Sequence, residues 1–385
     1  MRIVINSLSV FSGGGLTSMI NLLPALGKID MENEYVVIIS VRQTEVIRAI
    51  PERFGTHRVT FNPKNIVTRL LYEQLAMPFV LLRLGADWLY SVGNLTTLLA
   101  PCRILLLIEN ANPYSVLGLA WNGKERLRHW ALRALGTLSA RRASVIRFLS
   151  DNSRKIICGM AKIPLSKTTV IPHGVALHHN QSGKDINGKD LPKRFLLTVS
   201  NVGPHKNIHT LVDAFETLVK THHYQGSLVI VGAKHYPEYY KSLQSRIDHS
   251  QLGSKVVFLD WVDQEALSLL YKQAEVFVFP SAEETFGIPV VEAMGYGVPV
   301  VVASPGQKGA HYFIPYEEFC HSAAEYFDVF DSSSLCERMH YVLTDERRRQ
   351  EMVTAGKELA RQYLWDDVAS ALAGVFRGVN ARVPA

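Results

Sequence analysis

The sequence predicts an α/β protein built from two doubly wound parallel-sheet domains. Short apolar runs rich in β-branched residues alternate with helical patterns, as they do in buried parallel sheets. The alternation occurs in two series, which are separated by the polar, glycine-containing segment 176–194. The chain has 385 residues, 47% of them hydrophobic, which is sufficient for two domains with full cores.

The first series occupies the amino-terminal half of the chain. A strand is predicted at residues 2–8 and a helix at 16–27. Because the chain begins with a strand pattern and no apolar signal segment, no signal peptide is expected. Further strands are predicted from three apolar runs, EYVVIISV, RILLLIEN and SVIRFLS.

The second series follows the polar segment. The run FLLTVSN predicts a strand, and residues 208–221 predict the helix after it. Further strands are predicted from SLVIVG, KVVFLD, EVFVFP and VPVVVAS. Sheets of this kind bind ligands at the carboxyl ends of their strands, so the two domains are expected to face a ligand-binding cleft.

The charge is unevenly distributed along the chain. Residues 1–190 carry a net charge of +11 and residues 191–385 carry −5, within an overall charge of +6. Most single charges are solvated surface, but a lopsided half suggests that one domain faces something anionic.

Several classes of protein are excluded by composition. The apolar stretch near residue 80 is interrupted by Glu73 and Arg83, so it is too short for the ~18 residues of a membrane span. The four cysteines are scattered and form no CxxC pair, which favours a reducing cytoplasm and argues against a structural zinc site.

Two carboxylates stand beside a predicted helix start in the run PSAEETFGIPVVEAMGYGVPVV, residues 280–301. The helix is expected to begin near Gly287, with Pro289 in its first turn. Its free N–H groups and positive dipole end form an anion site, and glycine lets a phosphate approach closely. Glu284 precedes the helix and Glu292 lies in its second turn. Both carboxylates can accept hydrogen bonds from hydroxyl groups. Taken alone, Glu284 is equally consistent with a residue that only interacts favourably with the helix dipole.

Two loops add groups that suit phosphate. Lys206 lies between a predicted strand and helix, where its ammonium could neutralise a diphosphate. Gly13, Gly14 and Gly15 form a glycine loop after the first strand. The loop does not have the G-x-G-x-x-G pattern, so no nicotinamide cofactor is inferred. Taken singly, a loop lysine is usually solvated surface and a glycine run is usually a turn.

A basic stretch in the first domain has apolar side chains between its basic residues. It is consistent with an ordinary solvated helix or with a helix lying on an anionic bilayer. No nucleic-acid-binding module accompanies the charge, so a nucleic-acid partner is not expected. The basic residues are Lys124, Arg126, Arg128, Arg133, Arg141, Arg142 and Arg147, interleaved with Trp130, Leu132 and Leu135.

Together these motifs resemble those of the retaining glycosyltransferases of family four, which have the GT-B fold of two Rossmann-like domains. The resemblance covers essentially the whole chain and is strongest over residues 195–304. Glu284 and Glu292 match the family signature of two glutamates separated by seven residues. GPHKN matches the phosphate-binding lysine loop, and LDWVDQEALSLLYKQAEVFVFPS matches the segment around the nucleotide base. VIPHGV resembles the inter-domain segment, and LARQYLWDDVASAL resembles the carboxyl-terminal helix.

The resemblance implies a role for each matching residue. Lys206 would neutralise the diphosphate, and Glu284 would contact the transferred sugar near the reacting carbon. Glu292 would bind the ribose hydroxyls. The other contacts would come from the backbone: Phe286, Gly287 and Ile288 for phosphate, Val262 for the base, and Gly13, Gly14 and Gly15 for donor phosphates and acceptor.

The chain departs from the family pattern at three places. Asn201 stands where many members have an arginine, five residues before Lys206. No histidine follows the run RILLLI, so Asn110 or Asn112 would supply a neutral hydrogen bond instead. His173 stands where asparagine is usual. The first two departures fit a different donor geometry, a different subfamily or weakened catalysis.

The resemblance also implies the domain boundaries. Residues 1–178 would form an acceptor-side Rossmann-like domain, and residues 179–194 a linker. Residues 195–364 would form the Rossmann-like domain that binds the nucleotide sugar. Residues 365–385 would form a helix that crosses back to the first domain.

The resulting expectation is a retaining, metal-independent hexosyltransferase that needs no cofactor. It would move a sugar from a GDP- or UDP-linked donor to a glycan or lipid-linked glycan, in bacterial cell-surface polysaccharide (lipopolysaccharide) biosynthesis. It would be cytoplasmic and peripheral at the inner face of the membrane, with an anionic membrane surface as partner. Two alternatives remain: a nucleotide-sugar 2-epimerase of the same fold, and a non-catalytic partner that binds nucleotide sugars.

Overall fold

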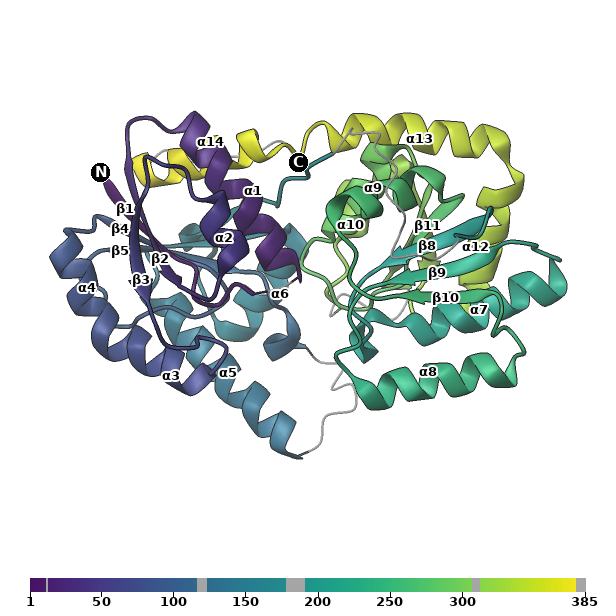
Figure 1. Ribbon diagram of the computed structural model, residues 1–385, viewed down its shortest axis with the longest axis horizontal. Coiled ribbons are helices and arrows are strands. Elements are labelled where there is room, and N and C mark those ends of the chain that lie inside the picture. The colour runs from purple at the N-terminus through teal and green to yellow at the C-terminus, as the bar shows by residue number, and fades with distance from the viewer. Residues whose placement is uncertain (12, 116–122, 178–190, 307–311, 379–385) are drawn as a thin grey trace. The chain divides into compact units, whose positions relative to one another are not determined.

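The computed structural model describes residues 1–11, 13–115, 123–177, 191–306 and 312–378 (Figure 1). The chain divides into two compact units. Unit 1 comprises Met1–Ser115, Trp121–Gly174 and Tyr363–Ala385, and unit 2 comprises Val116–Ala120 and Val175–Gln362. Most of the predicted linker 179–194 lies outside the described residues. The two units are described separately below.

Unit 1 contains a seven-stranded parallel sheet in the order β3-β2-β1-β4-β5-β6-β7. The order reverses between β1 and β4, which is the position where doubly wound sheets bind ligands at their carboxyl edge. The strands are β1 (Arg2–Asn6), β2 (Glu34–Ser40), β3 (Gly55–Val59), β4 (Trp88–Ser91), β5 (Arg103–Ile108), β6 (Val145–Phe148) and β7 (Thr168–Val170). Three strands of this sheet were not predicted from the sequence: the edge strands β3 and β7, and β4, which has only 4 residues.

Helices connect the strands of unit 1. They are α1 (Gly13–Ile29), α2 (Thr44–Ala49), α3 (Ile66–Leu71), the π-helix η1 (Tyr72–Ala76), α4 (Met77–Leu84), η2 (Asn112–Tyr114), α5 (Gly123–Arg142), α6 (Asp151–Ala161), η3 (Leu165–Lys167) and α14 (Trp365–Arg377). In the described part of the chain, no helix is both long enough and apolar enough to cross a bilayer.

The helix α14 belongs to unit 1, although it lies at the far end of the sequence. It packs along α1, and the indole Nε1 of Trp88 donates to the carbonyl oxygen of Phe376 at 3.1 Å. Lys28 and Asp366 add an ion pair between the two helices. The carboxyl-terminal helix was expected over residues 365–385, and residues 379–385 lie outside the described part.

Arg147 corrects one expectation. The sequence analysis grouped it with the basic residues of a solvated or membrane-facing stretch, but it lies on β6 and is fully buried. Its guanidinium donates to the carbonyl oxygens of Ile171 and Pro172 and to the hydroxyl of Tyr90, at 2.7–2.8 Å. Arg147 therefore holds β6 and the segment after β7 together, and it faces neither solvent nor a membrane.

Unit 2 contains a six-stranded parallel sheet in the order β10-β9-β8-β11-β12-β13, reversing between β8 and β11. The strands are β8 (Phe195–Val199), β9 (Ser227–Val231), β10 (Val256–Leu259), β11 (Val276–Phe279), β12 (Val300–Ser304) and β13 (Ala324–Asp328). Together with unit 1, this sheet confirms the predicted α/β class with two doubly wound parallel sheets.

The helices of unit 2 pack around this sheet. They are η4 (Pro204–Lys206), α7 (Ile208–Thr221), α8 (Pro237–His249), α9 (Gln264–Gln273), α10 (Ile288–Tyr296), α11 (Tyr316–Phe319), η6 (His321–Ala323), α12 (Ser332–Thr344) and α13 (Glu346–Ala360).

Gly232 lets two loops meet at the carboxyl edge of this sheet. It follows β9 with φ 144°, and a Cβ there would overlap the carbonyl oxygen of Ser200. Only glycine fits this close approach of two backbones. The loop that follows β8, which carries Asn201 and Lys206, is thereby held against the end of β9.

Candidate functional site

Two of the predicted donor residues of unit 2 lie on neighbouring loops at the point where the strand order reverses. Lys206 ends η4 in the loop after β8, and Glu284 lies in the loop between β11 and α10. The carbonyl oxygen of His205 accepts from the amide of Ala282 at 3.0 Å and from the Ser281 hydroxyl at 3.3 Å. These bonds tie the two loops together.

Lys206 and Glu284 form an ion pair through Nζ and Oε1. Their side chains are only 15% and 16% exposed. The sequence analysis assigned the two residues to different parts of a donor, and the structure shows that they also contact each other. The two charges of a mostly buried ion pair depend strongly on each other, because removing one side chain leaves the other charge uncompensated.

The start of α10 is a helix amino terminus with a glycine at its N-cap. Gly287 precedes the helix with φ 99°, a left-handed conformation that favours glycine. A Cβ there would lie 2.9 Å from Cε1 of Tyr316, so glycine is also needed for packing. The N-cap residue Gly287 has no side chain with which to cap α10, and Pro289 lies in the first turn. The positive end of the helix dipole is therefore not neutralised by a cap.

Phe286 and Ile288 flank Gly287 and are buried, 2% and 7% exposed. Their backbone lies at the start of α10, where the phosphate contacts were expected. Val262 is also buried, in the loop between β10 and α9, whereas Asn201 is half-buried in the loop after β8. All four positions thus lie at the carboxyl edge of one sheet.

Glu292 lies in the second turn of α10 and is 4% exposed. The hydroxyl of Tyr271 donates to its Oε2 at 3.1 Å, and the ring of Tyr271 stacks on Tyr296 at 5.4 Å. Burial raises the pKa of the Glu292 carboxyl to about 7. The carboxyl is therefore protonated at a higher pH than the carboxyl of an exposed glutamate.

Two residues at this edge were missed by the sequence analysis. Glu283 is 6% exposed, and burial raises the pKa of its carboxyl to about 7 in spite of nearby Lys206. Tyr316 is fully buried against Gly287, and its pKa is raised by burial and by Glu284. Glu283 adjoins a signature glutamate and could have been selected on that ground. Tyr316 lies 29 residues from Gly287 in the sequence and carried no local signal.

In unit 1 the glycine loop approaches a half-buried acid, Glu109, whose side chain is 20% exposed. Gly13 starts α1 with φ 63°, and a Cβ on Gly15 would lie 3.2 Å from Oε1 of Glu109. Burial raises the pKa of the Glu109 carboxyl to about 7. The sequence analysis passed over Glu109 in favour of the asparagines after it. Its position directly after β5 was the available signal.

The asparagines that were predicted to replace a histidine take part in local hydrogen bonds that hold this loop. The side-chain carbonyl of Asn110 accepts from the amide of Asn112 at 2.9 Å, and the backbone of Asn110 is held by Asn94. His173 Nε2 lies 4.0 Å from Oε2 of Glu109. Its pKa is lowered by burial and by Arg147, so the imidazole is neutral at pH 7.

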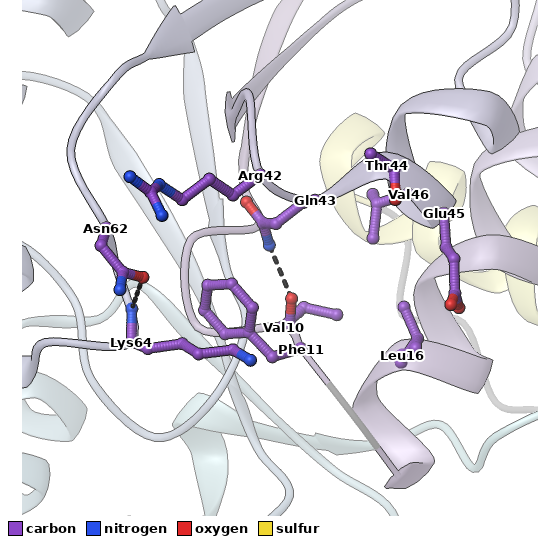
Figure 2. A pocket seen from close by; sticks show the side chains of 10 residues that line it. All are labelled: Val10, Phe11, Leu16, Arg42, Gln43, Thr44, Glu45, Val46, Asn62 and Lys64. Atoms are coloured by element: carbon purple, nitrogen blue, oxygen red, sulfur yellow. Dashed lines mark hydrogen bonds between the residues drawn. The ribbon is translucent and has the colours of Figure 1, made fainter. Parts of the chain in front are cut away.

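A cavity of about 270 Å³ opens at the carboxyl edge of the unit 1 sheet (Figure 2). Three neighbouring loops line it, after β1, β2 and β3. Arg42 and Lys64 bring two exposed cations, and Lys64 lies 5.5 Å from the ring of Phe11. Gln43 donates to the carbonyl oxygen of Val10 at 2.6 Å. The cavity is also lined by Leu16, Thr44, Glu45, Val46 and Asn62.

Residues 180–359 match the family model described as "Glycosyl transferases group 1". The match covers most of unit 2, including both signature glutamates and Lys206. Within the described ranges, no group of three or more His, Cys, Asp or Glu side chains is arranged to hold a metal ion.

Curated relatives cover part of the chain. The chain is 29% identical to "Uncharacterized glycosyltransferase MJ1607" of Methanocaldococcus jannaschii, over 64% of this chain and 63% of that protein. It is 31% identical to "O-antigen chain mannosyltransferase RfbU" of Salmonella typhimurium, over 44% of this chain and 45% of that protein. The chain therefore spans less than two thirds of the length of these relatives.

Solved structures match nearly the whole chain. Sucrose-phosphate synthase from Thermosynechococcus elongatus superposes with a TM-score of 0.75 at 16% identity, over 98% of both chains. Anabaena Alr3699/HepE in complex with UDP-glucose superposes with a TM-score of 0.74 at 18% identity, over 98% of this chain and 100% of that one. The chain has the GT-B fold. The GT-B fold class that the sequence predicted is thus confirmed.

Proposed function

We propose that this GT-B protein is a retaining glycosyltransferase. It transfers a sugar from a GDP- or UDP-linked donor to a glycan or lipid-linked glycan in cell-surface polysaccharide biosynthesis. The observation that carries the proposal is the Lys206–Glu284 pair at the uncapped start of α10. The family match over residues 180–359 and the similarity to an O-antigen mannosyltransferase support it.

The proposed mechanism assigns a role to each donor-side group. Lys206 and the start of α10 hold the diphosphate and stabilise the negative charge that grows on it as the sugar leaves. Glu284 accepts hydrogen bonds from hydroxyl groups of the transferred sugar, and Glu292 accepts hydrogen bonds from those of the ribose. The acceptor hydroxyl oxygen bonds to the anomeric carbon as the carbon–phosphate oxygen bond breaks. Attack on the same face, with the acceptor proton passing to the leaving diphosphate, gives retention. The scheme uses no cofactor and no metal.

The acceptor is proposed to bind unit 1. The glycine loop at Gly13–Gly15 and the adjoining cavity with Arg42 and Lys64 support this assignment. Two cations without an ion-pair partner among the described residues suit an acceptor that carries phosphate or carboxylate groups.

A donor panel tests the proposed function. Purified protein is melted with GDP- and UDP-linked sugars after thorough chelation, because a ligand that binds the native state raises its apparent stability. The stabilising donor is then incubated with lipid-linked glycan acceptors, and the anomeric configuration of the product is determined by NMR. An isomeric nucleotide sugar formed from donor alone would identify an epimerase. Donor binding without sugar transfer to any acceptor in the panel would identify a non-catalytic partner.

Donor affinity is expected to rise about tenfold between about pH 6 and pH 8. The pKa of the Glu292 carboxyl is about 7 and the ribose hydroxyls bind its ionised form. Below that pKa the carboxyl must lose a proton before it binds, and above it this cost disappears. The measurement is titration calorimetry with an intact nucleotide sugar, whose diphosphate does not titrate in this range.

Two matched variants separate Glu292 from its neighbour. Glu292→Gln should weaken binding at high pH and flatten the pH dependence. Glu283→Gln removes a carboxyl whose pKa is also raised to about 7, from the loop before α10, and it should leave the slope in place. A slope that survives in Glu292→Gln would show that another group carries the proton.

The protein is further proposed to be cytoplasmic and to attach to the inner face of the membrane through unit 1. The helix α5 supports this proposal. Arg126 and Arg128 are exposed, and Leu127 and Trp130 are 67% and 68% exposed. Exposed cations beside exposed apolar side chains are typical of helices that lie on anionic bilayers.

Reversing three charges, Arg126→Glu, Arg128→Glu and Arg133→Glu, is expected to release the protein from anionic vesicles. Each close Lys or Arg contributes about 1 kcal/mol of attraction, so the triple variant loses a large part of it. Vesicle flotation at low salt measures the change. Donor hydrolysis should be unaffected, because the proposed nucleotide site belongs to unit 2. Flotation equal to that of the native chain would remove the role of α5.

A further inference from the structure

The helical run through α3, η1 and α4 exposes large apolar side chains. These side chains are between 56% and 70% exposed, although large apolar side chains are usually buried in a protein core. Surfaces of monomeric proteins seldom keep so many large apolar groups together, and such patches usually mark an interaction site. The set comprises Val67, Leu71, Leu75, Phe79 and Leu82, and it is called the apolar stripe below.

The five side chains share one side of the run. Their spacing is four, four, four and three residues. On a helix of 3.6 residues per turn, each step of four advances by about 40°. The π-helical turn at Tyr72–Ala76 contains more residues per turn, which offsets this advance midway along the run. The stripe is therefore straighter than the same spacing would give on a regular α-helix.

The opposite side of the run is already in the core. Glu73 is 3% exposed, and Met77 and Leu81 are fully buried. The side-chain amide of Asn6, at the end of β1, donates to Oε1 of Glu73 at 3.0 Å. These contacts fix the rotation of the run. A helix that is apolar on both sides is normally buried on both, and here the packing within unit 1 covers only one.

The exposed charges between Val67 and Leu82 and at the two ends of the stripe are mostly positive. Between residues 62 and 87 the exposed charged side chains are Lys64, Arg83 and Asp87. Asp87 lies beyond Leu82, and its carboxylate accepts from the backbone amide of Arg2 at 2.7 Å. The single acid between the two ends of the stripe, Glu73, is buried, and its Oε1 lies 4.0 Å from Arg69. An anionic surface would therefore meet cations at the two ends of the stripe and no exposed carboxylate along it.

The stripe continues toward α5. Leu99 is 74% exposed. It lies on a loop that is hydrogen-bonded to η1 on one side and to α5 on the other. Gln74 of η1 accepts from the amide of Leu98 at 3.0 Å and donates to the carbonyl oxygen of Thr96 at 3.1 Å. Arg142 of α5 donates to the carbonyl oxygens of Leu98 and Ala100, at 3.0 and 2.6 Å. This loop connects the stripe to the basic helix α5.

We propose that the apolar stripe docks unit 1 on an anionic lipid bilayer, with its side chains inserted at the boundary between headgroups and acyl chains. Lys64 and Arg83 would lie at the level of the phosphates. The cationic surroundings and the bonded connection to α5 favour a bilayer over a second copy of the chain, whose own stripe would bring like charges together. The proposal deepens the membrane attachment proposed above and does not depend on transferase activity.

The test uses the full chain and vesicles of phosphatidylglycerol mixed with phosphatidylcholine. Leu75→Ser with Phe79→Ser is expected to lower the vesicle partition coefficient at least about tenfold, because each buried methylene contributes to interfacial binding. The binding that remains should be abolished by high salt, whereas part of the native binding should persist. The control is Leu165→Ser with Leu364→Ser, which removes two exposed apolar side chains of unit 1 outside the stripe. It should bind as the native chain does.

Two further readouts keep the outcome decisive. The melting temperature and the donor affinity of the stripe variant should equal those of the native chain, because the changed side chains are exposed and lie in unit 1. Unchanged vesicle binding would overturn the proposal. Unchanged vesicle binding together with the loss of a dimer in sedimentation would identify a second copy as the occupant. Failure of the donor panel would leave this result standing.

Discussion

Replacing Lys206 by alanine is expected to lower turnover at least about 100-fold, because the ammonium stabilises charge that develops on the leaving diphosphate. The side chain is 15% exposed and is held against Glu284. Its position is therefore fixed before a donor binds, as such stabilisation requires. The measurement is kcat for sugar transfer under saturating donor and acceptor.

The control for this variant is Lys220→Ala. Lys220 belongs to the same unit and also forms an ion pair, with Glu216, but its side chain is 57% exposed. Exposed pairs contribute little to stability, and this lysine lies outside the proposed site. Lys220→Ala should keep native turnover. Native turnover in a folded Lys206→Ala variant would remove Lys206 from the mechanism.

Replacing Glu284 by alanine is expected to lower turnover by a similar factor, at least about 100-fold, with a smaller effect on donor affinity. The reason is its proposed contact with the transferred sugar close to the reacting carbon, where the interaction changes during the reaction. Glu292→Ala should have the opposite pattern, because ribose contacts change little between ground state and transition state. Comparing kcat with the donor dissociation constant in the two variants tests this difference.

The Lys206–Glu284 contact adds a second readout. Each single alanine variant leaves one mostly buried charge without its partner, and the double variant leaves neither. The losses of unfolding free energy should therefore be non-additive, with a coupling of about 0.5–3 kcal/mol. Strictly additive losses would show that the two side chains do not form the pair in solution. This result is independent of turnover, so it tests the geometry separately from the chemistry.

The local part of the proposed site was predictable from the sequence. Gly287, Pro289 and the two signature glutamates lie within a single strand–loop–helix segment, where sequence spacing determines distance. The helix start and the second-turn position of Glu292 were predicted from that segment, whereas the left-handed conformation of Gly287 was not. Lys206 was found by its resemblance to a known loop, and its contact with Glu284 was not predicted.

Three features depended on contacts between distant segments. Glu109 lies beside Gly15, although 94 residues separate them in the sequence. Arg147 was taken for a surface residue because it follows a basic helix. The direction of a strand side chain depends on register, and β6 turns this one into the core. The raised pKa values of Glu109, Glu283 and Glu292 follow from burial, which no local pattern specifies.

The sequence by itself determined that the chain forms two parallel sheets, because the alternation of apolar strands and helices is a local property with a fixed period. It also determined that a charged residue interrupts the apolar stretch near residue 80. Only the tertiary structure decided where that charge points. Asn6 and the core of unit 1 draw Glu73 inward, and this rotates Leu75 and Phe79 outward. A helix with two apolar sides can bury either one, and the choice is made by the partners that the sheet presents to it.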